Sequence, residues 1–351
     1  MLSTQTALRL WLTLSLGAGL TGAFIAHGAA APNMEVLQSW KLGGDGGWDY
    51  LTMDSAKKRL FISRATRVDV VSVESGKLIG SIPETQGVHG IALAPALNRG
   101  FTSNGRANSV TVFDLDTLKV IQEVKIPGRN PDAILYEPSG KHVFTFNGAS
   151  KDVTVLDASS LAVVATIPVP DKPEFAAQDG RGQIFVNIES DPGQMLVIDA
   201  QKLSVKSTWP LPGCNSPSGL AIDSVHRRLF SVCDGKVMAV TDTVGGKQAA
   251  LVPIGEHPDA AAFDKKRGLV FSSNGEGTLS VVRQDSADRY TVIQTVATQR
   301  GARTMALDEA SGKVYLVTAD FGPAPPATAE QPHPRPALIP NSLIVLVVGE
   351  R

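Results

Sequence analysis

Residues 87–127 have the sequence GVHGIALAPALNRGFTSNGRANSVTVFDLDTLKVIQEVKIP, and residues 130–168 have the sequence NPDAILYEPSGKHVFTFNGASKDVTVLDASSLAVVATIP. Both stretches contain four short apolar or alternating runs separated by turn residues such as Asn-Gly, which is the pattern of a four-stranded antiparallel meander. The second stretch follows the first at a shift of about 43 residues, a period typical of repeat folds. These stretches predict a chain built from repeated four-stranded units.

Seven such units follow one another along the chain. Their corresponding first-strand positions are Asp49, His89, Asp132, Glu174, Ser218, Asp259 and Arg303. A single meander is stable only when it stacks against like units, either in an open solenoid or in a closed ring. Closure is favoured because residues 36–42 resemble the fourth strand of the other units, whereas residues 342–348 form a third strand with no fourth after it. The sequence therefore predicts an all-β, seven-bladed β-propeller over residues 31–351, with its last blade closed by the N-terminal strand.

The N-terminus has the features of a secretory signal. One cation, Arg9, precedes an apolar run over residues 10–25 and the small residues 28–31. This order predicts cleavage near Ala30. A membrane anchor is the alternative, but the run is shorter than the roughly 20 residues that a span needs. We therefore expect residues 1–30 to be a signal peptide, and the mature protein to be periplasmic or secreted, with no membrane span.

Charge and cysteine content limit the partners and the chemistry. Lys and Arg total 33 against 34 Asp and Glu, a net charge of -1, so there is no basic excess and nucleic acid is not an expected partner. Cys214 and Cys233 are expected on the same rim of one blade, where an oxidising compartment favours a disulfide over two buried free thiols. No C-x-x-C-H motif is present, which excludes covalent c-type haem.

Two stretches carry a family resemblance. Residues 102–121, TSNGRANSVTVFDLDTLKVI, and residues 146–167, FNGASKDVTVLDASSLAVVATI, resemble the YVTN-type β-propeller repeat proteins. The resemblance extends over essentially the whole mature chain, and the periplasmic YncE-like proteins are the nearest named set. It implies an exported seven-bladed propeller and little about chemistry. The fifth unit departs from the pattern, with Cys233-Asp234-Gly235 in place of Asn-Gly.

A candidate site follows from the propeller geometry. The first strand of each blade lines the central channel, so the seven first-strand positions are expected to face one mouth of that channel. The second-strand ends are expected to surround them: Arg64, Asn104, Asn147, Ile188, Cys233, Asn274 and Thr318. The predicted ligand-binding residues are Asp49, His89, Asp132, Glu174, Asp259, Arg303, Asn104, Asn147 and Asn274.

Two interpretations of these polar residues remain open. Carboxylates beside asparagine carbonyls suit a hard cation such as calcium or magnesium, with candidate ligands Asp49, Glu174, Asn104, Asn147, Asp259 and Asn274. A carboxylate paired with His89 also suits acid-base chemistry, which makes His89 the candidate base. Alternatively, these residue types recur because turns require them, since Asp and Glu bond backbone amides and Asn-Gly forms tight turns.

The last blade contains a proline-rich insertion over residues 321–340. Loops of this length inside a compact domain are usually functional or disordered. We expect this loop to fold over the channel mouth with His333 and Arg335 reaching inward; a solvated surface loop is the alternative.

These observations favour an exported binding module that recognises a small molecule or a partner protein at the channel mouth. The alternative is a metal-assisted enzyme of the lactonase or lyase kind that uses the same site. A redox accessory role is weakened by the lack of any haem or copper motif. No H-E-x-x-H, G-x-S-x-G or Walker motif is present, which excludes the corresponding zinc protease, serine hydrolase and nucleotidase classes.

Overall fold

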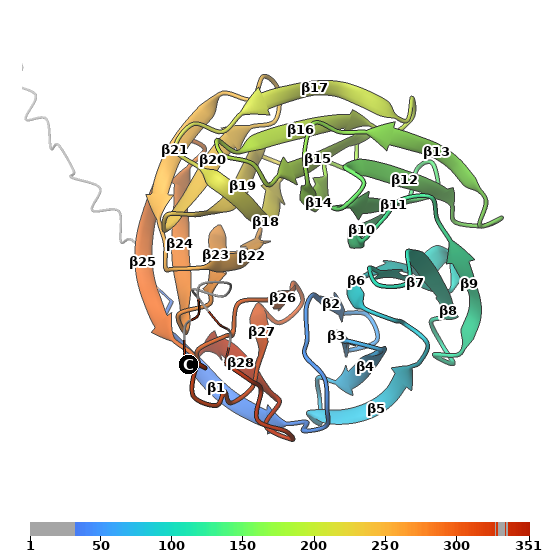
Figure 1. The fold of residues 1–351 in the computed structure, drawn as a ribbon. Coiled ribbons are helices and arrows are strands. Elements are labelled where there is room, and N and C mark those ends of the chain that lie inside the picture. Colours follow the sequence, from blue (N-terminus) through green and yellow to red (C-terminus); the bar gives the residue numbers. More distant parts are fainter. Residues whose placement is uncertain (1–31, 327, 329–333, 335) are drawn as a thin grey trace, which may run out of the picture. The chain divides into compact units, whose positions relative to one another are not determined.

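The computed structural model describes residues 32–326, 328, 334 and 336–351, and Asn33–Arg351 form one compact unit. The predicted signal peptide therefore lies outside the described residues. Seven four-stranded antiparallel sheets are arranged radially as the blades of a propeller (Figure 1). The predicted architecture is confirmed.

Each of the first six blades is a meander of four consecutive strands. Blade 1 contains β2 (Leu51–Asp54), β3 (Arg59–Arg64), β4 (Arg67–Ser72) and β5 (Lys77–Ile82). Blade 2 contains β6 (Val88–Ala94), β7 (Arg99–Asn104), β8 (Ser109–Asp114) and β9 (Val120–Lys125). Blade 3 contains β10 (Pro131–Glu137), β11 (His142–Asn147), β12 (Asp152–Asp157) and β13 (Val163–Pro168).

The next three blades repeat this order. Blade 4 contains β14 (Pro173–Gln178), β15 (Gln183–Ile188), β16 (Gln194–Asp199) and β17 (Ser204–Pro210). Blade 5 contains β18 (Asn215–Asp223), β19 (Arg228–Asp234), β20 (Val237–Asp242) and β21 (Gln248–Pro253). Blade 6 contains β22 (Pro258–Asp264), β23 (Leu269–Asn274), β24 (Thr278–Ser286) and β25 (Arg289–Ala297).

Blade 7 joins the two ends of the described chain. It contains β26 (Met305–Asp308), β27 (Lys313–Thr318) and β28 (Ile344–Glu350), and its outer strand is β1 (Met34–Lys41). In this blade Trp40 pairs with Val345 across the β1–β28 ladder. Met34 also ties the closing strand to blade 6, because its N–H donates to Gln294 Oε1 at 2.9 Å and its carbonyl accepts from Gln294 Nε2 at 2.8 Å. The predicted closure by the N-terminal strand is confirmed.

The hydrophobic core lies between adjacent blades. Middle strands such as β3 and β7 are buried along nearly their whole length, whereas outer strands such as β5 and β9 are mostly exposed. This explains why the middle strands are nearly continuous in apolar residues, since both of their faces are covered. Phe61 of blade 1 and Phe113 of blade 2, for example, meet with ring centroids 5.9 Å apart. Stacking of neighbouring blades thus buries the surface that a single blade would expose.

Helical structure within the described residues is limited to a single 3-10 turn, Pro95–Leu97. In the part of the chain that the structure describes, no helix has the length and the hydropathy of a membrane span.

Hydroxyl groups on the second strands fix where the first strands begin. In blade 2 the Ser103 hydroxyl accepts from the Gly90 N–H at 2.9 Å and donates to the backbone carbonyl of Asp132 in blade 3. In blade 6 the Ser273 hydroxyl donates likewise to the carbonyl of Arg303 in blade 7. These bonds hold the channel-facing residues of neighbouring blades in register.

Candidate functional site

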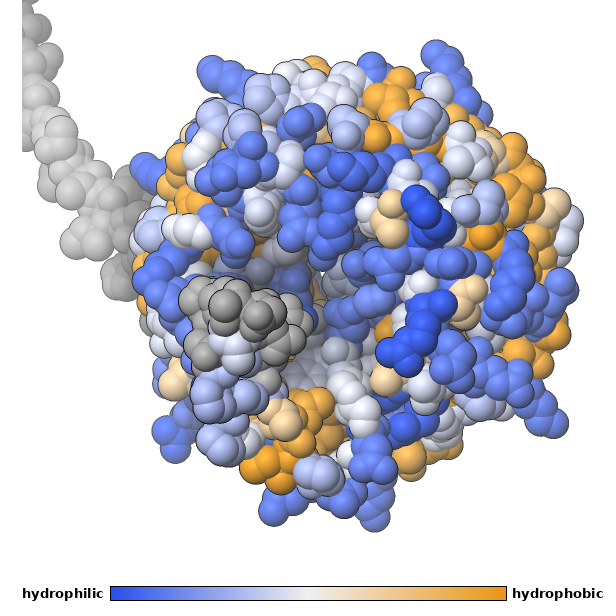
Figure 2. All heavy atoms as spheres, viewed as in Figure 1, coloured by the Kyte–Doolittle hydropathy of each residue, from blue (hydrophilic) through white to orange (hydrophobic). Residues whose placement is uncertain are grey.

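One face of the propeller is hollowed at the centre of the ring, and hydrophilic residues gather around the hollow (Figure 2). The charged first-strand residues nominated from the sequence lie close to one another here. Direct ion pairs join Asp49 to His89 and Asp259 to Arg303, and Glu174 pairs with Lys172. We call this group, together with Asp132 and Glu189, the carboxylate ring.

Asp49, His89 and Asp132 come from blades 1, 2 and 3 and converge on one point. His89 Nδ1 lies 2.5 Å from Asp49 Oδ2 and 3.6 Å from Asp132 Oδ1. One possible ligand atom from each of the three residues lies within 4.8 Å of the others. Burial lowers the pKa of His89, but the hydrogen bond with Asp49 and the charges of Asp132 and Asp49 outweigh it and raise that pKa to about 9. His89 is therefore a cation at neutral pH and balances part of the acidic charge.

Two other carboxyl groups of the ring, those of Glu174 and Asp259, have raised pKa values. Burial is the largest cause: it raises the pKa of Glu174 to about 8, with a further contribution from Asp132. Burial likewise raises the pKa of Asp259 to about 7, against the opposing charge of Arg303, whose Nε lies 3.2 Å from Asp259 Oδ2. Lys172 bridges Glu174 and Glu189. The ring contains five carboxyl groups and three cations, and the raised pKa values of Glu174 and Asp259 reduce its negative charge at neutral pH.

An aromatic contact lies beside the carboxylate ring. Tyr50, in the sequence directly after Asp49, packs edge-on against Phe175 of blade 4 with ring centroids 5.2 Å apart, and also contacts the core cluster of blades 3 and 4. Burial and the charges of Asp132 and Glu174 raise the pKa of Tyr50 well above its ordinary value. The ring therefore borders an apolar surface, which penalises ionised carboxyl groups.

The structure does not bring the predicted asparagines to the mouth. Asn104, Asn147 and Asn274 are fully buried, and their amides bond side chains of their own blades. Asn104 Nδ2, for example, donates to Thr111 Oγ1 at 2.8 Å, and its Oδ1 accepts from Thr102 Oγ1 at 2.8 Å. The expected convergence of asparagine carbonyls with carboxylates is therefore wrong, because the amide groups are used inside the sheets.

Arg64 is also absent from the mouth. Its side chain is buried, pairs with Asp69 at 3.1 Å and donates to the backbone carbonyl of Asp45 at 2.8 Å. It holds the loop that leads from β1 into blade 1. Arg64, which was expected among the second-strand ends around the mouth, therefore does not neutralise the ring, whereas Arg303 pairs there with Asp259.

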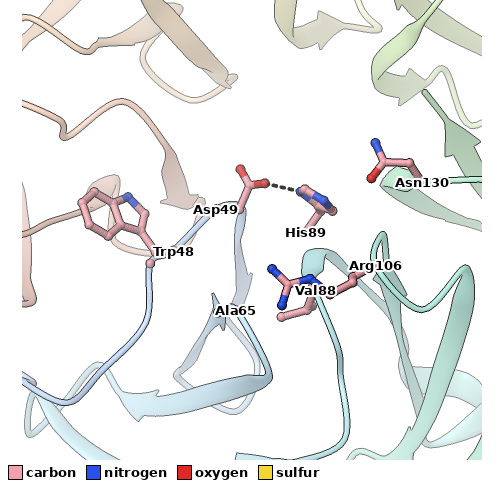
Figure 3. A pocket seen from close by; sticks show the side chains of 9 residues that line it. Trp48, Asp49, Ala65, Val88, His89, Arg106 and Asn130 are labelled. Atoms are coloured by element: carbon pink, nitrogen blue, oxygen red, sulfur yellow. Dashed lines mark hydrogen bonds and ion pairs between the residues drawn. The ribbon is translucent and has the colours of Figure 1, made fainter. Parts of the chain in front are cut away.

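A pocket of about 460 Å³ opens beside the Asp49–His89 pair, where blades 1 and 2 meet (Figure 3). Sequence reasoning missed its aromatic and polar residues Trp48, Arg106 and Asn130. Arg106 and Asn130 lie inside the repeated stretches, but the residues at the corresponding places of the other units differ in type, so comparison between units gave no signal for them. One signal was available in the sequence: the segment Trp48-Asp49-Tyr50 has two aromatic residues where the corresponding segments of the next two units, G-V-H-G and N-P-D, have none.

Glycines allow the two loops of this pocket to approach each other. Gly87 has a φ of +69°, and its carbonyl accepts from the Gly105 N–H at 2.8 Å. A Cβ at Gly105 would lie 2.6 Å from His89 Nε2 and 2.7 Å from Asn130 Oδ1. Nε2 of His89 and the amide oxygen of Asn130 thus lie together over Gly105, while Nδ1 of His89 is bound to Asp49. His89 is held from one side and presents its other nitrogen toward the pocket.

The proline-rich insertion begins and ends next to this pocket. Phe321 and Leu338 form an isolated β-bridge, and the Gly322 N–H donates to the Ala337 carbonyl at 2.9 Å. Phe321 also packs against Trp48 with ring centroids 6.2 Å apart. The residues expected to reach into the mouth, His333 and Arg335, lie outside the described residues.

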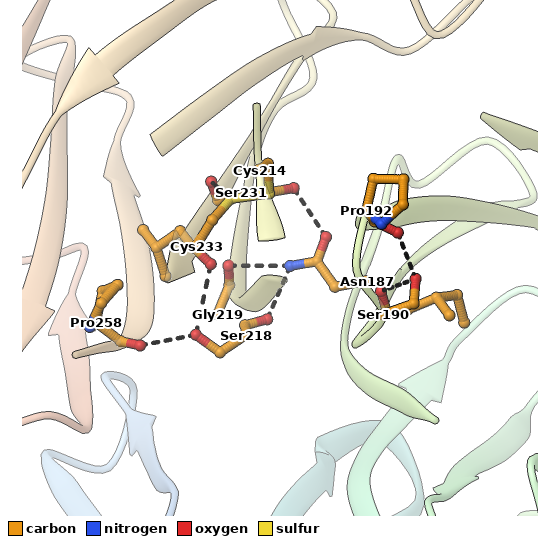
Figure 4. Close-up of a disulfide and its surroundings, with 11 residues drawn as sticks. Asn187, Ser190, Pro192, Cys214, Ser218, Gly219, Ser231, Cys233 and Pro258 are labelled. Atoms are coloured by element: carbon orange, nitrogen blue, oxygen red, sulfur yellow. Dashed lines mark hydrogen bonds between the residues drawn. A yellow bond between two sulfur atoms is a disulfide. The ribbon is translucent and has the colours of Figure 1, made fainter. Parts of the chain in front are cut away.

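Cys214 and Cys233 form a disulfide in blade 5 (Figure 4). Both residues are fully buried, and nearby Asn187 of blade 4 donates to the Ser218 carbonyl at 2.8 Å. The bridge therefore braces the junction of blades 4 and 5. Neither cysteine lines the pocket at blades 1 and 2.

Comparison with known proteins supports the architecture. No protein-family model matches the chain, and no curated protein matches it. Among solved structures, hydrazine synthase of Kuenenia stuttgartiensis is similar, with a TM-score of 0.68 and 18% identity, covering 83% of this chain and 95% of that chain. Membership of the YVTN-type, YncE-like proteins stays a prediction. A likeness at this level of identity shows the fold alone, and the fold is that of a β-propeller.

Proposed function

We propose that the protein is an exported binding module that recognises a small, polar, hydroxyl-bearing molecule at the channel mouth. The observation that carries this proposal is the composition of the pocket at blades 1 and 2. Trp48 supplies an apolar wall, while Asp49, Arg106 and Asn130 supply an acceptor, a donor and a group that is both (Figure 3). Pockets that combine apolar surface with a few fixed polar groups are typical of small-molecule sites.

The charges around the pocket support a neutral polyol or saccharide. The carboxylates Asp49 and Asp132 disfavour anions, while Arg106 at the pocket disfavours an organic cation. A neutral ligand with several hydroxyl groups can donate a hydrogen bond to Asp49 and accept one from Arg106 without electrostatic repulsion from either residue. Its C–H face would lie against the indole of Trp48, where apolar contact contributes most.

Calorimetric titration with a panel of monosaccharides and linear polyols tests this proposal. We expect saturable binding that Trp48→Ala weakens at least tenfold and Trp48→Phe weakens less, because phenylalanine keeps an apolar ring. Arg181→Ala is the control, since Arg181 lines a separate hollow between blades 4 and 5. Binding that is unaffected by Trp48→Ala, or a panel in which no compound binds, would refute the proposal.

The alternative function, a metal-assisted enzyme of the lactonase or lyase kind, loses much of the support that it had from the sequence. The ligand set nominated for calcium or magnesium depended on three asparagines that are buried within their blades. Of the remaining candidates, Glu174 and Asp259 engage Lys172 and Arg303, which leaves Asp49 as the carboxylate of that set at the pocket. Binding without chemistry is thus the function that this geometry supports better.

Export is part of the proposal. The basic, apolar and small-residue order of residues 1–30 supports a cleaved signal, and the Cys214–Cys233 bridge suits an oxidising compartment. N-terminal sequencing of the purified protein should give a chain that begins near Pro32. An intact Met1 on the secreted or periplasmic protein would contradict cleavage.

A further inference from the structure

We propose that Asp49, His89 and Asp132 bind a divalent transition-metal ion such as Zn²⁺ in the wall of the pocket. The inference rests on the proposed function, because it places the ion next to the same ligand. The three residues occupy corresponding positions at the starts of three successive blades, so the propeller itself brings them together. Their ligand atoms lie within 4.8 Å of one another.

The burial of Asp132 also favours a bound cation. Asp132 is only 7% exposed, and its ion-pair partner among the described residues is His89, whose Nδ1 lies 3.6 Å from Asp132 Oδ1, beyond hydrogen-bonding distance. A carboxylate that is largely removed from water gains from a cation that it contacts directly. The same carboxylate faces the point where Asp49 and His89 meet.

The distances suit an ion after a small adjustment. Two ligand atoms that are each about 2.1 Å from one ion lie roughly 3.0–3.4 Å apart. The 3.6 Å between His89 Nδ1 and Asp132 Oδ1 is close to this range, whereas the 2.5 Å between Nδ1 and Asp49 Oδ2 is too short. Asp49, which is partly exposed at the pocket, would move away by about half an ångström as the ion displaces the proton of His89 Nδ1 and replaces the hydrogen bond between His89 and Asp49. Metal binding would therefore release this proton to solvent.

The donor set selects the class of metal. One imidazole nitrogen and two carboxylates suit zinc, manganese or iron, whereas calcium and magnesium prefer oxygen ligands alone. Asp49 and His89 line the pocket, so the open side of the ion would face the bound molecule or water. A hydroxyl-bearing ligand could then bind the ion directly.

The test measures metal content and affinity on the purified protein. After chelation, the protein is dialysed separately against Zn²⁺, Mn²⁺, Ca²⁺ and Mg²⁺, and bound metal is measured by inductively coupled plasma mass spectrometry. We expect about one Zn²⁺ or Mn²⁺ per chain and no stoichiometric calcium or magnesium. Co²⁺ substitution should give a visible absorption spectrum that His89→Ala abolishes.

Matched variants separate the site from the rest of the ring. His89→Ala and the isosteric Asp132→Asn should each lower the affinity at least tenfold. His226→Ala is the matched control, because His226 pairs with Asp223 at 2.6 Å in blade 5 and no third possible ligand joins them among the residues that the structure describes. Asp259→Asn removes a ring carboxylate outside the proposed site and should change the affinity less than threefold.

The outcomes are distinguishable from those of the proposed function. No stoichiometric metal, equal loss in His226→Ala, or full affinity in Asp132→Asn would overturn the metal site. Polyol binding by the chelated protein would leave the proposed function standing in that case. Metal binding without response to any compound of the panel would instead refute the proposed function alone.

Discussion

Substitution of Asn104 by alanine tests whether the repeated asparagines are structural. Asn104 makes three hydrogen bonds inside blade 2: its amide donates to Ser109 Oγ at 3.1 Å and to Thr111 Oγ1 at 2.8 Å, and it accepts from Thr102 Oγ1 at 2.8 Å. Alanine removes all three and leaves buried hydroxyl groups without their partner. With roughly 1 kcal/mol for each bond, the loss in the free energy of unfolding is about 3 kcal/mol. For a chain of this length that corresponds to a fall in Tm of roughly 5 °C.

Chemical denaturation followed by circular dichroism measures this loss, and the metal and polyol titrations are repeated on the same variant. We expect lower stability with unchanged ligand affinities. Asn215→Ala is the control, because Asn215 is exposed at the rim of blade 5 and its removal should change stability by less than about 0.5 kcal/mol. If Asn104→Ala lost less than about 1 kcal/mol while metal or ligand affinity fell tenfold, the asparagine would belong to the mouth and the structural argument would be refuted.

Three further substitutions probe the disulfide, the acidic ring and the pocket. Replacing both Cys214 and Cys233 by alanine opens a loop with a sequence separation of 19 and should cost about 3 kcal/mol on denaturation, with unchanged ligand affinity. Because burial raises the pKa of Asp259 to about 7, the folded state binds a proton more tightly than the unfolded state, and this contribution to stability is lost as the pH rises toward and through 7. The wild type should therefore lose about 2–3 kcal/mol more than Asp259→Asn between pH 5 and pH 8 in denaturation curves; equal curves would contradict the shift. Gly105→Ala places a Cβ 2.6 Å from His89 Nε2, so it should weaken metal binding severalfold while circular dichroism shows an intact fold, and unchanged affinity would show that His89 is free to move.

The fold could be predicted because its determinants are local and repeated. The alternation of apolar and turn residues fixes each strand, and the spacing between units fixes the number of blades. Closure could also be predicted, because the segment around Trp40 has the pattern of an outer strand and the chain ends on a third strand. These features depend on strand periodicity, which a single sequence displays directly.

The orientation of the asparagines required information from the neighbouring strand. Asn104 ends its strand, which suggested a position on the rim, but its side chain points along the sheet to Ser109 and Thr111 on the next strand. The same arrangement joins Asn147 to Asp152 and Thr154. Each of these two asparagines is followed by a hydroxyl or carboxylate residue five positions later and by a hydroxyl residue seven positions later along the chain. This spacing was visible in the sequence, but it has meaning only when the pairing of the two strands is considered.

The pocket was harder to predict because it depends on unlike residues from separate loops. Trp48, Arg106 and Asn130 come from three different connections, and no spacing rule relates them. Their convergence follows from the angle between blades and from the contact of Gly87 with Gly105. Such proximity is a property of the closed ring, which local patterns do not encode.

The hydrogen-bond partners decide between the turn interpretation and the site interpretation of the acidic residues. Where this chain uses aspartate to build a turn, the carboxylate accepts backbone N–H groups of its own turn: Asp114 accepts from Thr117 N–H at 2.8 Å. Asp49 and Asp259 do not build turns in this way. Their carboxylates pair with side chains of the following blade, and among the described residues neither accepts a backbone N–H. Turn chemistry therefore accounts for the aspartates of the outer loops and leaves the ring unexplained. Carboxylates that stay buried at an energetic cost without supporting a turn are expected where a protein binds a ligand or an ion, which favours the proposal that the molecule binds its ligand beside the ring.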